Sequence, residues 1–294
     1  MMVFYFYDMT EDFIAHISKQ IKAPIESIHS VSGGDISSAY KIITSGQSYF
    51  LKTNTISNAL QMFQTEAEAL KTIANTNTIS TPKVLDYSQF KNTSFLLLEF
   101  IDSKSPDSED FKTLGRQLAE LHKNTNAYFG LQQDDFIGSL IQYNKPTDSW
   151  NSFYVNERLY PQLQLAIQRQ LLLESECPSK GQMLNKLNPL FQNIKPSLLH
   201  GDLWSGNYLI ATNGKPYLID PAMYFGDSEV DIAMTKLFGG FSEDFYKAYH
   251  NMIPEDEFTS NRIEVYQLYY LLIHLNLFGK SYYSSVINLL KKYF

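Results

Sequence analysis

The sequence predicts an α+β protein with a small β-rich N-terminal lobe and a larger, mainly helical C-terminal lobe. Up to residue 101, helical patterns alternate with pairs of β-like runs, whereas most of the chain beyond residue 110 shows helical spacing of its apolar residues. Between them, Asp102 to Asp110 is polar, with one proline and no apolar residue, as expected of a hinge. We therefore expect lobes at residues 1–101 and 102–294, with a hinge at about 99–103.

In the N-terminal lobe, the first helix follows a candidate cap at Thr10 and places Phe13, Ile17 and Ile21 on one stripe. A Ser45-Gly46 pair then joins two β-like runs into a hairpin. The expected elements are a helix at Thr10–Lys22, strands at Ile36–Thr44 and Gln47–Thr53, a helix at Ala59–Ala74, and strands at Val84–Phe90 and Ser94–Ile101.

In the C-terminal lobe, helical patterns dominate, although Pro161 should break or kink one of them. An Asn213-Gly214 pair marks the turn of a second hairpin. The expected elements are helices at Phe111–His122 and Trp150–Leu173, a hairpin of Tyr208–Ile210 with Tyr217–Ile219, and helices from Ser228 onward.

Composition excludes several classes of protein. Of the 294 residues, 44% are apolar and 19% are charged, as in a globular protein with a sizeable core. A formal net charge of −7 argues against a nucleic-acid partner, because nucleic-acid binding needs a basic face. The single cysteine, Cys177, excludes an intramolecular disulfide and a zinc site built from cysteines.

No segment has the pattern of a targeting or membrane-spanning sequence. The apolar start, Met1 to Asp8, lacks a basic region, so a secretory signal is not expected. No window approaches the roughly 18 uninterrupted apolar residues of a membrane span. We therefore expect a cytoplasmic monomer without a membrane partner.

Three polar positions in the N-terminal lobe suggest phosphate chemistry. Gly33-Gly34 lies between strand candidates, where backbone N–H groups could approach phosphate oxygens, although such a pair is more often a plain hairpin turn. Strand alternation places Lys52 on the apolar face of Phe50, and helical spacing places Glu66 on the apolar face of the next helix. We predict an ion pair between Lys52 and Glu66; the alternatives are a lysine that snorkels to solvent and a glutamate at a partly exposed edge.

The most specific pattern is His-Gly-Asp-Leu-Trp-Ser-Gly-Asn at residues 200–207, followed by Tyr-Leu-Ile-Asp at 217–220. It matches the His-x-Asp-x4-Asn catalytic loop of protein-kinase-like phosphotransferases and the metal-binding aspartate that follows a short hairpin. In that chemistry Asp202 is the general base that accepts the proton of the attacking hydroxyl, and Asn207 and Asp220 bind Mg²⁺. We therefore predict protein-kinase-like phosphoryl transfer.

Together with Asp220-Pro221-Ala222, this loop resembles that of the fructosamine kinase family, or ketosamine 3-kinases, which belongs with the aminoglycoside phosphotransferase-like enzymes. The Trp-Ser pair at 204–205 separates this family from other small-molecule kinases. The similarity runs from about residue 25 to 290. Further matching segments are Gly33–Ser37, Trp150–Tyr154, Arg158-Leu159, Gln162-Leu163, Gly226–Glu229, Phe238–Phe241 and Tyr266–Leu268.

The resemblance implies a two-lobed, protein-kinase-like fold, ATP binding at the hinge and phosphorylation of the O3 hydroxyl of a ketosamine, the adduct of a sugar with a free amine or a protein lysine. Such a phosphate makes the adduct unstable, so the implied role is deglycation. Glu99 and Ile101 would offer backbone groups to adenine, and Lys52 would contact the α- and β-phosphates. The nucleotide-binding residues implied are Gly33, Gly34, Ile36, Ser37, Lys52, Glu66, Glu99, Phe100 and Ile101.

Several alternatives remain open at this stage. Trp204 could bind the substrate, through a sugar face or a cationic amine, or it could pack the loop onto the helical lobe. The acceptor could instead be choline, ethanolamine or an aminoglycoside, and a non-catalytic nucleotide-binding module is a third hypothesis. Asp231 is expected to be structural, within a capping box that starts at Ser228, and His122 and His200 are expected to lie in the core.

Overall fold

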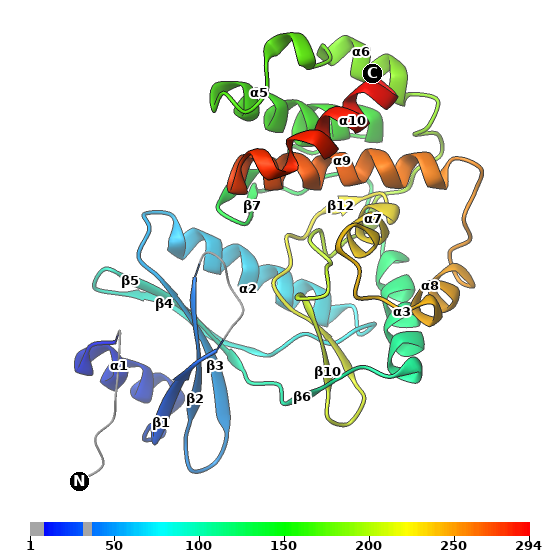
Figure 1. Cartoon of the computed structure of the whole chain (residues 1–294). Helices are drawn as coiled ribbons and strands as arrows, with labels where there is room; N and C mark the ends of the chain where they lie inside the picture. Colours follow the sequence, from blue (N-terminus) through cyan, green and yellow to red (C-terminus); the bar gives the residue numbers. More distant parts are fainter. Residues whose placement is uncertain (1–8, 32–36) are drawn as a thin grey trace.

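The computed structural model describes residues 9–31 and 37–294, which form two lobes (Figure 1). The N-terminal lobe is an antiparallel sheet of strand order β1-β2-β3-β5-β4 with two helices. Its elements are α1 (Glu11–Ile21), β1 (Ser27–Ser30), β2 (Ser38–Ile43), β3 (Ser48–Asn54), α2 (Ala59–Asn75), β4 (Val84–Phe90) and β5 (Thr93–Glu99).

Alternation along the strands divides the apolar residues of this lobe between two small cores. Leu51, Phe95 and Leu97 pack with the apolar stripe of α1. Leu96 and Leu98, which point to the opposite face, pack with Phe63, Ala67 and Leu70 of α2. Because Lys52 is one residue from Leu51, its side chain lies on the α2 face of the sheet.

The C-terminal lobe is built from helices around α9, which buries residues along its whole length. Its helices are α3 (Ser108–His122), α4 (Trp150–Phe153), α5 (Tyr160–Gln168), α6 (Lys180–Leu187), α7 (Glu229–Phe238), α8 (Glu243–His250), α9 (Thr259–Phe278) and α10 (Tyr283–Tyr293). Its strands are β6 (Ser103–Lys104), β7 (Asp135–Ile137), β8 (Leu140–Gln142), β9 (Ser197–Leu198), β10 (Tyr208–Ala211), β11 (Pro216–Leu218) and β12 (Phe225–Gly226).

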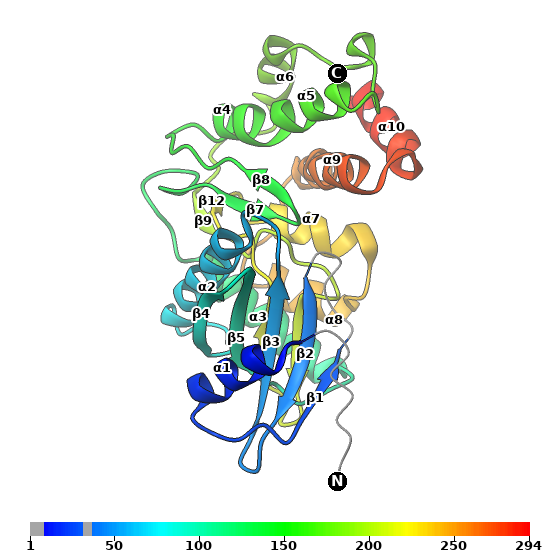
Figure 2. The same cartoon turned by 90° about the vertical axis from the view of Figure 1, so that its left-hand side faces the viewer.

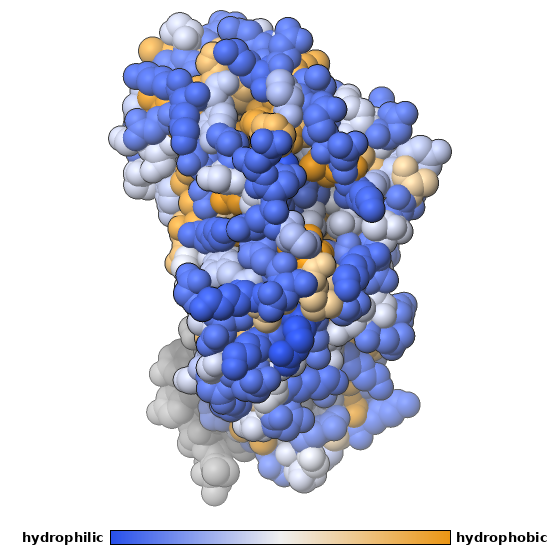
Figure 3. Space-filling model, turned by 90° about the vertical axis from the view of Figure 1, so that its right-hand side faces the viewer, coloured by the Kyte–Doolittle hydropathy of each residue, from blue (hydrophilic) through white to orange (hydrophobic). Residues whose placement is uncertain are grey.

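The surface of the molecule is mainly polar, as expected of a chain whose apolar residues pack in its core. In the face shown in Figure 3, hydrophilic side chains cover most of the molecule, and apolar patches lie mainly over the upper, helical lobe. Over residues 9–31 and 37–294, no helix combines the length and the apolar character that crossing a bilayer requires.

Most elements predicted from the sequence are confirmed, and the polar run from Asp102 to Asp110 is the main difference. Strand β6 pairs with β10 of the C-terminal lobe, and α3 already begins at Ser108. The Asp107 side chain caps α3, and the Asp110 carboxylate accepts the Asp107 backbone N–H. The two residues form a capping box. The polarity of this run therefore reflects a helix start as well as a connection between lobes.

The helix predicted at Trp150–Leu173 also differs from the prediction. A π-helical stretch, Tyr154–Leu159, separates α4 from α5, and Pro161 lies in the first turn of α5, where its missing N–H costs no bond. The helix ends at Gln168, because Gln170 adopts a left-handed backbone with φ of 57°.

A buried carboxylate joins the helical lobe to the predicted catalytic loop. Asp231 of α7 accepts hydrogen bonds from the backbone N–H groups of His200 (2.7 Å) and Gly201 (2.8 Å) and from His122 Nε2 (3.0 Å). Asp231, His122 and His200 are at most 1% exposed. The structural roles expected for the three residues are confirmed, but the capping box is wrong, since Ser228 makes no side-chain cap bond.

Replacing Asp231 by Asn should lower the free energy of unfolding by about 2–4 kcal/mol, because a buried amide cannot accept all three bonds. Urea denaturation followed by circular dichroism measures this change. Glu243→Gln, an exposed change in the first turn of α8, is the matched control and should stay within about 0.5 kcal/mol of the parent. Equal stability of the Asp231 variant and the parent would show that the junction is dispensable.

Candidate active site

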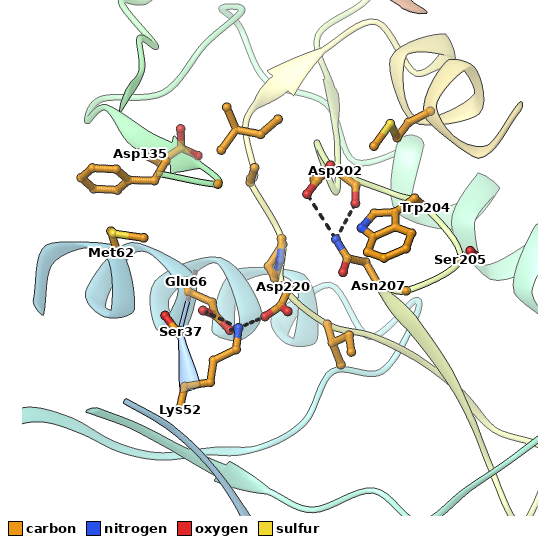
Figure 4. Close-up of a pocket in the computed structure, with 18 of the residues that line it drawn as sticks. Ser37, Lys52, Met62, Glu66, Asp135, Asp202, Trp204, Ser205, Asn207 and Asp220 are labelled. Carbon is orange, nitrogen blue, oxygen red and sulfur yellow. Dashed lines mark hydrogen bonds and ion pairs between the residues drawn. The ribbon is translucent and has the colours of Figure 1, made fainter. Parts of the chain in front are cut away.

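A cleft of about 1070 Å³ lies between the two lobes. This is large for a single small ligand, and it leaves room for a nucleotide and a second molecule together. Gly33, Gly34 and Ile36 lie outside the described residues. The cleft is lined by the other ten residues singled out from the sequence, Ser37, Lys52, Glu66, Glu99, Phe100, Ile101, Asp202, Trp204, Asn207 and Asp220. Figure 4 labels all of these except Glu99, Phe100 and Ile101.

One buried lysine holds two carboxylates at the centre of the cleft. Lys52 Nζ donates to Glu66 Oε1 at 2.9 Å and to Oε2 at 3.0 Å, which confirms the predicted ion pair. The same Nζ also donates to Oδ1 of Asp220, which arrives from the far end of the β10–β11 hairpin. The contact joins β3, α2 and the C-terminal lobe through a single charge (Figure 4).

The pKa values of these three groups follow from burial and shared charge. Burial lowers the pKa of Lys52, but the charges of Asp220 and Glu66 outweigh it, and the net pKa is raised. Burial raises the pKa of Glu66 to about 8 against the opposing effect of Lys52. For Asp220 the raising effect of burial is outweighed by Lys52, so its pKa is lowered. The three groups form one buried cluster, in which the charge of Lys52 opposes the effect of burial on both carboxylates.

The backbone places Asp220 in a conformation that a residue with a Cβ seldom adopts, with φ of 53°. The neighbouring residues fix this turn, because His200 Nε2 donates to the Ile219 carbonyl at 2.8 Å and the Ala222 N–H donates to the His200 carbonyl at 2.9 Å. Burial lowers the pKa of His200, in agreement with a neutral ring whose Nδ1 accepts the Asp202 N–H at 3.2 Å.

Asp202 and Asn207 form the second polar group of the cleft. Asn207 Nδ2 donates to the Asp202 carbonyl oxygen at 2.8 Å and to Asp202 Oδ2 at 3.3 Å, so the amide oxygen Oδ1 is left for another partner. Burial, with the charges of Asp220 and Asp231, raises the pKa of Asp202 to about 7. A carboxylate with such a pKa suits proton transfer near neutral pH.

The segment that connects the lobes is held by contacts with Lys83 and with Lys41. The Glu99 N–H donates to the Lys83 carbonyl at 2.9 Å, and the Lys83 N–H donates to the Glu99 carboxylate at 3.2 Å. Lys41 Nζ lies 3.9 Å above the Phe100 ring and 3.4 Å from Asp102 Oδ1. These contacts fix the segment 99–102, of which Glu99, Phe100 and Ile101 line the cleft.

Trp204 lies on its own loop and lines the cleft, and 39% of its surface is exposed. A Cβ on Gly206 would lie 2.4 Å from the six-membered ring of this indole, so the ring rests directly on the Gly206 backbone. The indole thus lies against its own loop and borders the cleft. The orientation of the Trp204 indole depends on the lack of a side chain at Gly206.

Asp135 is a cleft residue that the sequence analysis missed. It lies at the start of β7 and is 5% exposed. The signal that could have found it is the pair Gly138-Ser139, with φ of 61° at Gly138, which turns β7 into β8. Strands of three residues are too short to show alternation clearly, and this hairpin was not predicted.

The lysine–glutamate pair, the aspartate–asparagine loop and the second aspartate, set between a β-rich and a helical lobe, define a two-lobed kinase-like phosphotransferase that acts on a hydroxyl group. The family model for fructosamine kinase matches residues 9–294. The chain belongs to the fructosamine kinase family.

Known relatives agree with this membership. A probable ketoamine kinase from Synechocystis sp. is 40% identical over 271 residues, which cover 91% of this chain and 90% of the relative. The chloroplastic protein-ribulosamine 3-kinase of Arabidopsis thaliana is 39% identical over 278 residues, which cover 92% of this chain and 83% of the relative. The crystal structure of a putative fructosamine-3-kinase from Haemophilus somnus superposes with a TM-score of 0.85 at 29% identity, covering 95% of this chain and 96% of that one.

Replacing Gly206 by Ala should displace the indole of Trp204, because the added methyl group would overlap its ring. The chain has two tryptophans, and Trp150 is buried, so Trp204 dominates the fraction of fluorescence that acrylamide quenches. We expect a shifted emission maximum and altered quenching. Gly181→Ala, where the added methyl meets nothing within 4 Å, should leave both unchanged. Identical spectra for the Gly206 variant and the parent would contradict the contact.

Proposed function

We propose that this protein is an ATP-dependent kinase that phosphorylates the O3 hydroxyl of ketosamines, either fructosamines or ribulosamines. The observation that carries the proposal is the convergence of Lys52, Glu66, Asp202, Asn207 and Asp220 in one cleft of a fructosamine kinase family member. The names of the relatives, ketoamine kinase and protein-ribulosamine 3-kinase, support this class of acceptor.

In the proposed reaction, Asp202 is the general base. Its carboxylate accepts the proton of the acceptor hydroxyl as that oxygen attacks the γ-phosphorus and ADP leaves. Asn207 holds the aspartate in place through its two hydrogen bonds. Because the transition state of phosphoryl transfer is loose, the protein acts mainly by positioning groups and balancing charge. Trp204 borders the same space and would contact the acceptor sugar or its amine.

The oxygen atoms of Asn207 and Asp220 fit a Mg²⁺ ion. Mg²⁺ prefers hard oxygen ligands and usually keeps several waters and phosphate oxygens, so one amide and one carboxylate suffice. No residue in the described part of the chain donates to Asn207 Oδ1, and the nitrogen of the same amide is already engaged. In the described part of the chain, no cluster of three His, Cys, Asp or Glu side chains could hold a metal by itself. A bound Mg²⁺ would neutralise charge on the transferred phosphate.

The remaining residues would bind the nucleotide. Lys52, held by Glu66, would contact the α- and β-phosphates, and backbone groups of Glu99 and Ile101 would contact adenine beside Phe100. Segment 33–37, with Gly33, Gly34, Ile36 and Ser37, would cover the phosphates.

The wider setting follows from this chemistry. Phosphorylation at O3 would make the sugar–amine adduct labile, so the activity would serve deglycation. We further propose a cytoplasmic monomer whose lobes divide at residues 101 and 102.

Turnover on a panel of acceptors tests the substrate class. We expect Mg²⁺-ATP consumption with fructosyl-lysine and ribulosyl-lysine, and background rates with choline, ethanolamine and an aminoglycoside. Asp202→Asn should lower kcat on the ketosamines by about 10²–10⁴-fold with little change in ATP affinity, because only proton transfer is removed. Turnover confined to choline, ethanolamine or the aminoglycoside would overturn the acceptor class, and ATP binding without any turnover would favour a binding module.

Replacing Asp220 by Asn should weaken nucleotide binding only when Mg²⁺ is present, because the variant loses a carboxylate ligand of the metal. Calorimetric titration with a non-hydrolysable ATP analogue should show a Kd at least about tenfold higher than that of the parent with Mg²⁺, and a similar Kd in EDTA. Glu68→Gln removes a nearby charge outside the cleft and serves as the control. A Mg²⁺-dependent Kd that does not change would count against Asp220 as a ligand.

A further inference from the structure

The β7–β8 hairpin places the carboxylate of Asp135 at the cleft. This carboxylate has no part in the proposed phosphoryl transfer. Asp135 pairs across the hairpin with Gln142, and β7 contacts α2. Figure 2 shows the hairpin between the N-terminal lobe and the helical layer, and Figure 4 shows Asp135 on the same cleft as Asp202 and Met62. The side chain is therefore at the junction of the lobes, although it is 5% exposed.

The two hydrogen bonds that described side chains donate to the Asp135 carboxylate both end on the same oxygen, Oδ1. Gln142 Nε2 and Asn144 Nδ2 each donate to Oδ1 at 3.0 Å. Both amides are fixed in turn, since Tyr269 donates to Gln142 Oε1 at 2.7 Å and Arg158 Nη2 donates to Asn144 Oδ1 at 2.7 Å. None of the described residues donates to Oδ2, which belongs to a residue that lines the cleft.

Within residues 9–31 and 37–294, no cation forms an ion pair with the Asp135 carboxylate. Arg158 is the nearby cation, but its guanidinium donates to the Tyr143 carbonyl and to Asn144, and it stacks on the Tyr224 ring at 3.9 Å. Burial raises the pKa of Asp135 to about 7, against a partial opposing effect of Arg158. A neutral amide at this position could accept the same two bonds without the cost of burying a charge. The fold alone therefore does not require a carboxylate here.

The cleft as a whole has an excess of negative charge. Among the residues that the structure describes, five carboxylates and one lysine line it, and that lysine is already shared by Glu66 and Asp220. Asp202 has a place in the proposed reaction, and Glu99 is bonded to the Lys83 backbone. Asp135 is the remaining carboxylate. A ketosamine carries a secondary amine beside its sugar, and this amine is protonated near neutral pH.

We propose that Asp135 binds the protonated amine of the acceptor through Oδ2 and thereby selects cationic ketosamines over neutral sugars. This assignment rests on the proposed kinase activity and adds an acceptor-binding residue to it. The pair formed would neutralise a charge that is costly in the empty cleft, so binding of the cation is favoured twice, by attraction and by relief of that cost.

Two acceptors that differ at one atom test the assignment. The first is 1-butylamino-1-deoxyfructose, which is cationic, and the second is the ether in which oxygen replaces the nitrogen. The parent protein should have a higher kcat/KM for the amine. Asp135→Asn should lower the value for the amine roughly tenfold to a hundredfold, the size expected for loss of a charged hydrogen bond, and leave that for the ether within about threefold.

Two further variants separate charge from folding. Asp134→Asn removes the same charge from the adjacent, exposed residue, whose carboxylate accepts the Asn144 N–H, and should leave the preference for the amine unchanged. Asp135→Glu keeps the charge and should keep a preference for the amine even if overall activity falls. Melting temperatures of all variants identify any that fail to fold.

The outcomes distinguish a failure of the Asp135 assignment from a failure of the proposed kinase activity. Equal loss on both acceptors in Asp135→Asn, or no loss on either, overturns the role of Asp135 while the kinase activity of the parent still stands. The role of Asp135 is also overturned if Asp135→Glu loses the preference for the amine while remaining folded. A parent protein that phosphorylates neither acceptor, nor any ketosamine of the panel, overturns the proposed function and this assignment with it.

Discussion

The structure depends on one buried ammonium group, that of Lys52, shared between a carboxylate of each lobe. Glu66 comes from α2 and Asp220 from the end of a hairpin in the C-terminal lobe, so the relative position of the lobes and the charge of the cleft are set by the same contact. A buried lysine requires such partners, because an unpaired charge in this position would be very costly. The phosphates of a nucleotide would enter this cluster as a third anionic partner of the same lysine.

A second support lies behind the catalytic loop. Asp231 accepts the N–H groups of His200 and Gly201, and a Cβ on Gly201 would lie 1.9 Å from the Ala222 carbonyl oxygen. Gly201 also has φ of 86°, so this close approach of two loop segments needs a glycine. The backbone of the loop that carries Asp202 is thus held by a buried carboxylate of α7, while Asp202 and Asn207 line the cleft.

The lobes, most helices and strands, and the pairing of Lys52 with Glu66 could be predicted from the sequence, because spacing and alternation report directly on which face is buried. The second partner of Lys52 could not, since the contact with Asp220 spans 168 positions and depends on how the lobes meet. Asp135 was missed because a hairpin of three-residue strands leaves almost no periodic signal. The capping box at Ser228 was predicted from a local pattern, but Asp231 binds the distant loop instead of its own helix end.

The single crossing between the lobes has a mechanical consequence. Glu99 is tied to Lys83 in the N-terminal sheet, and the Asp102 carbonyl accepts the N–H of Thr212 in the C-terminal lobe, which leaves only Phe100 and Ile101 between the two anchors. A second contact lies near this short link, because the Leu218 N–H of β11 donates to the Ser80 carbonyl at 2.8 Å and Ile73 and Ile79 pack into the core of the C-terminal lobe. The short link and this packed contact together hold the two lobes in register. The part of the cleft beside Phe100 and Ile101 is therefore the part whose dimensions are most firmly fixed.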